Sequence, residues 1–234
     1  MFGQMSIKGM SEQADYLQLN ICGLNAKSAI EKYDYFKRLR GEDIPVVLHG
    51  DWTNKGCSEN NIKGRYKEYI LIAKALGGMT DVKGITIHPP YRKKVAFNEF
   101  IDICEEIERN GINVFIENRS NNKIWLSEPK EVIDFSKCHS MTIDIPQLYI
   151  SCGFSNDCLN DTLSNLDWSN VKEIHLANLK RSERGTHVAR KLNDGEIDIQ
   201  SVMKYLTVDK LITLEILGGV PTFDNQIVHI KNRA

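Results

Sequence analysis

The sequence has no apolar run near the ~20 residues that a membrane-spanning helix needs, and no marked excess of charge of either sign. Its 30 lysines and arginines nearly balance its 31 aspartates and glutamates. The resulting net charge of -1 gives no bulk attraction to nucleic acid or to an anionic membrane. The first ten residues also lack the charged start and long apolar core of a signal peptide. We therefore expect a cytoplasmic protein that does not act on a membrane.

Cys-x-x-Cys pairs are absent as well, although the chain has six cysteines. This absence removes the usual signatures of a zinc ribbon and of a thioredoxin-like redox centre. We expect reduced thiols that mostly behave as small buried hydrophobic groups, as is typical of cytosolic proteins.

What the sequence does contain is a regular alternation of short β-like runs and segments with helical spacing of apolar residues. Alternating β and α units of this size favour parallel strands. Without a linker or a short repeat, the 234 residues fit one α/β domain spanning 1–234, a (β/α)8 TIM barrel. The predicted strands are 2–8, 16–21, 45–49, 84–88, 112–117, 141–145, 171–176 and 211–216, and the predicted helices are 27–40, 62–76, 97–109, 128–135, 159–166, 199–206 and 223–230.

The first unit of this barrel is short, because about seven residues separate the first two predicted strands. A crossover between parallel strands usually needs a dozen or more. Either the first helix is reduced to a turn near 11–13, or the barrel is incomplete. A second irregular segment, 181–193, is long and charged and follows the seventh strand, so we expect a loop over the mouth of the barrel.

Polar residues close six of the central predicted strands. Residues at the carboxyl ends of barrel strands meet at one mouth, so they are expected to share a site. Three imidazoles and three carboxylates suit Zn²⁺, Mn²⁺, Co²⁺ or Fe²⁺ better than Ca²⁺, and a bridging carboxylate allows one or two ions. The six candidate ligands are His49, His88, Glu117, Asp144, His175 and Glu215.

Three threonines stand two residues before three of these candidates. Side chains alternate along a strand, so Thr86 shares a face with His88, Thr142 with Asp144, and Thr213 with Glu215. We expect the hydroxyls to support the ligands from below or to form a polar layer under the metal. Of the other histidines, His139 and His229 are interpreted as structural, whereas His187 lies in the loop over the mouth and is a candidate substrate contact.

Together these residues resemble the xylose isomerase-like TIM barrel superfamily over nearly the whole chain. That superfamily includes ketose epimerases, hydroxypyruvate and inosose isomerases, and endonuclease IV-type AP endonucleases. The resemblance is carried by VLH at 47–49, IHP at 87–89, IEN at 116–118, TID at 142–144, IHLAN at 174–178, NDGEID at 193–198 and LE at 214–215.

The resemblance implies a metal on Glu117, Asp144, His175 and Glu215, with Glu117 and Glu215 as the catalytic base and acid. It also implies substrate contacts from Arg181, Gln147 and Asn118. The expected activity is metal-dependent isomerisation or epimerisation of a sugar, a sugar phosphate or a related hydroxyketone, by proton abstraction next to a carbonyl. The expected partner is thus a small carbohydrate-like molecule. The sequence gives no prediction of the oligomeric state.

The endonuclease branch is the alternative, because His49 and His88 with Glu117 would hold a second metal there. The chain departs from that branch at Gln147, where a histidine is expected, and lacks the Asp-x-His pair expected in the loop. These departures make a site with three metals, and nucleic acid as the partner, the less favoured reading. A degenerate barrel that binds a metal or ligand without turnover is a third reading.

Overall fold

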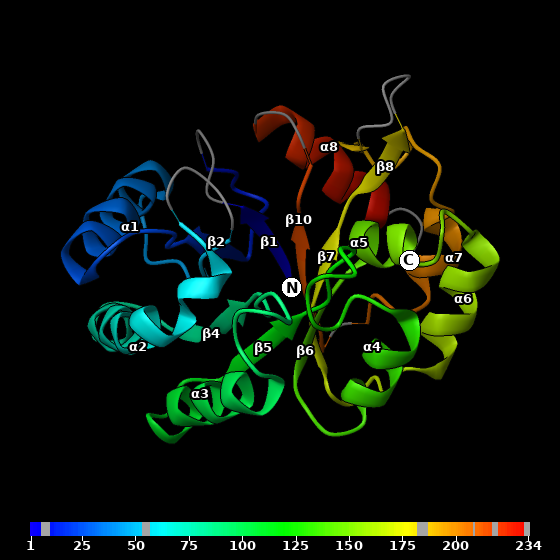
Figure 1. Ribbon diagram of the computed structural model, residues 1–234. Coiled ribbons are helices and arrows are strands. Elements are labelled where there is room, and N and C mark those ends of the chain that lie inside the picture. The colour runs from blue at the N-terminus through cyan, green and yellow to red at the C-terminus, as the bar shows by residue number, and fades with distance from the viewer. Residues whose placement is uncertain (6–9, 53–56, 182–186, 208, 217–219, 232–234) are drawn as a thin grey trace.

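The barrel is closed and all eight of its strands are parallel, as predicted. The computed structural model describes residues 1–5, 10–52, 57–181, 187–207, 209–216 and 220–231. The barrel strands follow one another in chain order, and β1 closes the ring by pairing with both β2 and β10 (Figure 1). These strands are β1 (Phe2–Met5), β2 (Tyr16–Asn20), β3 (Val46–His49), β4 (Val82–Ile87), β5 (Val114–Glu117), β6 (Met141–Asp144), β7 (Val171–Leu176) and β10 (Leu211–Leu214).

Helices surround the barrel on its outside (Figure 1). They are α1 (Ala26–Arg40), the 3-10 turn η1 (Glu59–Asn61), α2 (Ile62–Gly77), α3 (Phe97–Arg109), α4 (Pro129–Ser136), α5 (Ile145–Ser151), α6 (Asn156–Asn165), α7 (Ile199–Met203) and α8 (Val220–Lys231). No helix in the described part of the chain is long and apolar enough to cross a membrane.

The shortened first unit still allows closure. Described residues 10–15 between β1 and β2 form turns and bends, with no helix among them, so the first of the two predicted alternatives holds. In the predicted loop at 181–193, an antiparallel pair of strands, β8 (Asn178–Arg181) and β9 (His187–Arg190), replaces part of the loop. One helix, α5, was not predicted, and α6 begins before the predicted start at 159.

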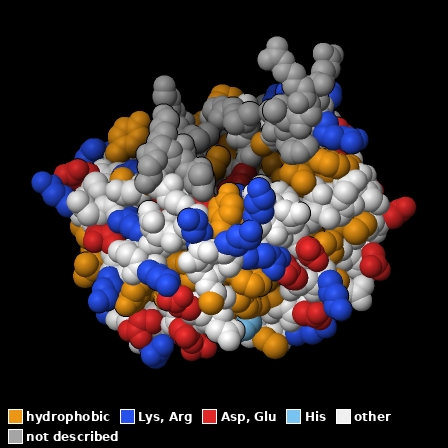
Figure 2. Space-filling view, in the orientation of Figure 1, with side chains coloured by type: hydrophobic (Ala, Val, Ile, Leu, Met, Phe, Trp, Pro, Cys, Tyr) orange, Lys and Arg blue, Asp and Glu red, His pale blue; other side chains and the backbone are white. Residues whose placement is uncertain are grey.

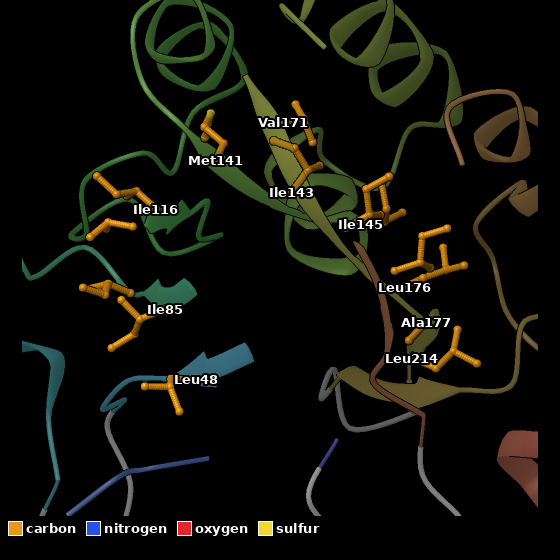
Figure 3. Packing of buried hydrophobic residues seen from close by; sticks show 14 of the residues in the cluster. Leu48, Ile85, Ile116, Met141, Ile143, Ile145, Val171, Leu176, Ala177 and Leu214 are labelled. Atoms are coloured by element: carbon orange, nitrogen blue, oxygen red, sulfur yellow. The ribbon is translucent and has the colours of Figure 1, made fainter. Parts of the chain in front are cut away.

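Two apolar regions separate the inside of the barrel from its outside. The larger lies between strands and helices, and Leu48, Ile85 and Ile116 from consecutive strands belong to it (Figure 3). The smaller is formed by Tyr16, Val47 and Phe115, which are buried together. Because strand side chains alternate, the residues between those of the outer layer are the ones left to face the barrel axis.

Candidate metal centre

Five of the six strand-end residues line one cavity of about 250 Å³, and the sixth, His175, lies against Glu117 and Glu215. All of the six except Glu215 are buried, and Glu215 keeps 25% of its side chain exposed. In the view of Figure 2 the surface is hollowed at its upper centre, where an acidic side chain is visible at depth. The lining residues are Met5, Gln18, Asn20, His49, Trp52, His88, Glu117, Arg119, Asp144, Gln147 and Glu215.

Glu117 lies at the centre of the ligand set. Its Oε2 is 2.9 Å from His88 Nε2, 3.4 Å from His49 Nε2 and 3.4 Å from His175 Nδ1. The same Nδ1 lies 3.5 Å from Glu215 Oε1. Potential ligand atoms therefore fall into overlapping groups, each within 4.8 Å: Glu117 with Asp144 and His175, His49 with His175 and Glu215, and His49 with His88 and Glu117.

An unpaired nitrogen shows that this donor set fits a divalent cation. Nδ1 of His175 is buried and has no hydrogen-bond partner among the described residues, although two carboxylates face it. A buried polar atom without a partner is costly, and a metal ion at this position would satisfy it. Nitrogen and oxygen donors in this combination suit Zn²⁺, Mn²⁺, Co²⁺ or Fe²⁺.

The electrostatics of the centre follow from placing several acids together. Burial raises the pKa of Asp144 well above its usual value, and repulsion from Glu117 and Glu215 adds to that shift. Burial acts in the same direction on Glu117, but His88 and His175 outweigh it and hold the pKa of Glu117 well below its usual value. Three clustered carboxylates in a buried site are a setting that a cation stabilises.

The pKa values of His88 and His175, the two histidines beside Glu117, are shifted in opposite directions. Burial lowers the pKa of His88 to about 3, since Arg119 and His49 partly cancel the attraction of Glu117. For His175, burial is outweighed by Glu215, Glu173 and Glu117, and its pKa is raised well above the usual value. His88 is therefore a neutral imidazole at neutral pH, the form of histidine that binds metals.

Below the centre lies a polar layer built around Glu173, a residue that sequence reasoning missed. Its carboxylate accepts hydrogen bonds from Thr86 Oγ1 at 2.5 Å, Thr142 Oγ1 at 3.2 Å and Thr213 Oγ1 at 2.6 Å. His175 Nε2 lies 3.4 Å from the same carboxylate. The three threonine hydroxyls thus bind Glu173, and the polar layer contacts the metal centre through His175. The available signal was position, since Glu173 is two residues before His175 and shares its face.

The predicted substrate contacts are only partly brought together. Gln147 lines the cavity, and its Oε1 accepts hydrogen bonds from the amide and hydroxyl of Ser120. Asn118 is fully buried and joins the ends of β5 and β6, because it exchanges two hydrogen bonds with the backbone of Asp144.

Arg181 does not belong to the cavity lining in the part of the chain that the structure describes. Arg181 lies on β8, is half exposed, and pairs with Glu196 at 3.0 Å while covering the ring of Phe154. The side chain of His187 falls outside the described residues. Arg119, which sequence reasoning missed, is the arginine that does line the cavity.

Comparison with known proteins identifies the class of fold. No protein-family model and no curated protein sequence matches the chain. A D-tagatose 3-epimerase-like protein matches with a TM-score of 0.70 and 16% identity, covering 99% of this chain and 96% of its own. A xylose isomerase domain protein from Salmonella typhimurium LT2 matches with a TM-score of 0.66 and 11% identity, over 99% and 96%. IolI protein with a bound zinc atom matches with a TM-score of 0.66 and 11% identity, over 98% and 97%.

These structures and this chain share the (β/α)8 barrel fold. At identities of 11–16% the likeness concerns the fold. Function has to be argued from the site.

Proposed function

We propose that the protein is a divalent-metal-dependent isomerase or epimerase of a sugar, a sugar phosphate or a related hydroxyketone. The observation that carries this proposal is the convergence of Glu117, Asp144, His175 and Glu215 at the mouth of the barrel, where the three carboxylates line one small cavity and His175 lies against two of them. The zinc atom in the IolI structure and the epimerase-like neighbour support it at the level of the fold.

Glu117, Asp144, His175 and Glu215 are the residues that would hold the ion. When bound, the ion would polarise the substrate carbonyl and the adjacent hydroxyl. This lowers the free-energy cost of removing the proton from the carbon that carries this hydroxyl. Asp144 is already fixed in place, since its carboxylate accepts a hydrogen bond from the Gln147 amide at 2.7 Å. His175 is held from below by Glu173.

Two carboxylates are placed to move the proton. Glu117 and Glu215 both face Nδ1 of His175, at 3.4 and 3.5 Å, from strands on different sides of the barrel mouth. Glu215 has 25% of its side chain exposed, so it reaches the cavity most directly and would remove the proton. Glu117 would return a proton at the opposite face or stabilise the product. With its Oε1 held by Ser120, Gln147 has an Nε2 group that would donate to a substrate oxygen.

Proton exchange with solvent tests this proposal. Incubation of the metal-loaded protein with a panel of ketoses and ketose phosphates in D₂O should place deuterium at the carbon next to the carbonyl. Glu215→Gln should reduce the exchange by about 10²–10⁴-fold, the usual contribution of a general base. Glu128→Gln, which changes an exposed glutamate away from the cavity, is the matched control and should exchange as the wild type does.

The second candidate is a dinuclear phosphodiesterase acting on abasic DNA, and the convergence of His49 and His88 on Glu117 favours it. Such an enzyme would nick a duplex that contains an abasic site, and its binding would weaken steeply with salt. Nicking without exchange on any sugar would reverse the order of the two proposals. A protein that binds metal but neither exchanges nor nicks would be a binding barrel without turnover.

A further inference from the structure

Arg119 occupies an unusual place at the mouth of the barrel. It stands two residues after Glu117, beyond the end of β5, and its backbone is fixed on both sides. The Arg119 amide donates to the carbonyl of Leu126 at 2.9 Å, and its own carbonyl accepts from Ser151 Oγ at 3.1 Å. Its side chain is 23% exposed and lines the cavity.

The guanidinium group contacts two of the three residues that could hold a second metal. Nη1 of Arg119 lies 3.1 Å from Glu117 Oε1 and 3.3 Å from His88 Nε2. With His49, these two residues make up the second ligand group of the centre. In the other group, which consists of Glu117, Asp144 and His175, Arg119 contacts only the carboxylate of Glu117.

We infer that Arg119 takes the place of a second metal ion beside His88 and Glu117 and supplies the positive charge there. The centre then holds a single divalent ion. That ion belongs to the group formed by Glu117, Asp144, His175 and Glu215. The inference rests on the proposed function for the existence of this ion, and it selects the mononuclear form of the site.

Hydrogen bonds occupy the His88 nitrogen that faces Glu117 and Arg119, whereas the other ring nitrogen, Nδ1, is buried and has no hydrogen-bond partner among the described residues. A metal needs a free lone pair on the imidazole nitrogen that binds it. If Nε2 of His88 carries a proton, it donates to Glu117 Oε2 at 2.9 Å; if it does not, it accepts from Arg119 at 3.3 Å. In both cases Nε2 is occupied while Arg119 stays in place.

Charge acts in the same direction. A guanidinium is always protonated and has no lone pair to offer, so a divalent ion beside it meets a fixed repulsion. Arg119 in turn forms an ion pair with Glu117 at 3.1 Å, and leaving this position would strip that buried carboxylate of its cation. A single ion bound to the other ligand group, by contrast, brings its positive charge next to the carboxylates of Asp144 and Glu215.

Metal stoichiometry tests the inference without reference to activity. Metal-free protein is titrated with Zn²⁺, and bound ions are counted by native mass spectrometry and calorimetry. The wild type should bind one equivalent tightly. Arg119→Met and Arg119→Gln should bind a second equivalent at least tenfold more tightly than the wild type does. Adding His88→Gln to Arg119→Met should return the count to one, and Arg181→Met, the matched loss of an arginine outside the cavity, should stay at one.

The possible failures separate this inference from the proposed function. Two tight equivalents in the wild type, or one equivalent in both Arg119 variants, would overturn the role of Arg119 and leave the metal-dependent function standing. A wild type that folds but binds no Zn²⁺, Mn²⁺ or Co²⁺ would overturn both.

Discussion

Glu173 shows how a single buried charge can support a candidate metal site that it does not join. It is fully buried inside the barrel, and three threonine hydroxyls and the Gln18 amide donate to its two oxygens. Burial acts to raise its pKa, but His175 and these donors outweigh burial and lower it, so the carboxylate is ionised at neutral pH. A carboxylate below a metal-binding imidazole fixes the orientation of the ring.

Glu173→Gln should therefore weaken metal binding by about 10–100-fold, the usual effect of losing such a partner. The amide keeps the size of the side chain but removes the charge that faces His175 Nε2 at 3.4 Å. Competition with a chromophoric chelator would measure the affinity. Glu131→Gln is the control, because Glu131 is a half-buried carboxylate that pairs with Arg92 at 2.7 Å outside the cavity. Equal affinity in Glu173→Gln and wild type would show that the polar layer only fills space.

At this scale the sequence predicted strand-end residues better than loop residues. The six candidate ligands could be found because parallel strands in a barrel end at one mouth, whatever the loops do. Arg119 and Arg181 both follow strands, and the position of each guanidinium depends on loop contacts with no periodic pattern. Arg181 was selected by resemblance, yet Glu196 and Phe154 hold it away from the cavity.

At the scale of elements, the length and the residue pattern of a segment explain whether it could be predicted. Helix α5 was missed because it is only seven residues long and follows β6 without a loop. Its start is set by Asp144, whose side chain caps the helix by accepting from the Gln147 amide. The β8–β9 hairpin was missed because its charged sequence lacks alternating apolar residues, the main signal for a strand.

Two glycines offer a paired test of how tightly the barrel is packed. A methyl group on Gly84 in β4 would lie 2.7 Å from the Phe115 ring and 2.8 Å from the carbonyl of Asn113, whereas one on Gly64 in α2 would meet nothing within 4 Å. Gly84→Ala should lower the free energy of unfolding by about 1–3 kcal/mol through overpacking. Gly64→Ala should raise it by up to about 1 kcal/mol, because alanine favours helix. Urea unfolding followed by circular dichroism would measure both, and a neutral Gly84→Ala would indicate a loosely packed interior.

For the whole molecule, the proposed metal centre would couple metal binding to the stability of the barrel. The four proposed ligands come from β5, β6, β7 and the end of β10, so an ion bound to them would tie together four neighbouring strands of the ring. At free metal 100 times the dissociation constant, binding adds about 2.7 kcal/mol to the free energy of unfolding. For a chain of this size that corresponds to a rise in Tm of roughly 5–10 °C. Addition of EDTA should reverse the rise, and a Tm that does not depend on metal would contradict a bound ion.

We expect the Asp144 carboxylate to stabilise the metal-bound fold and to destabilise the metal-free fold. Burial, with Glu117 and Glu215, raises the pKa of Asp144 above its value in the unfolded chain. The unfolded chain therefore releases this proton at lower pH, and the metal-free fold loses stability as pH rises from the unfolded pKa of about 4 through the folded one. Asp144→Asn removes this loss, and an amide oxygen can still accept from the Gln147 amide.

Without metal, Asp144→Asn should thus have a higher Tm than the wild type at pH 8, and the difference should shrink toward pH 4. With saturating Zn²⁺ the order should reverse, because the variant lacks one anionic ligand and gains less from the ion. Thermal unfolding of both proteins at several pH values, with Zn²⁺ and with EDTA, would measure the four combinations. If the variant is less stable than the wild type in EDTA at every pH, Asp144 serves to stabilise the fold itself. If the order of the two Tm values reverses between EDTA and Zn²⁺, the metal-free barrel is less stable because it keeps a carboxylate in place for a cation.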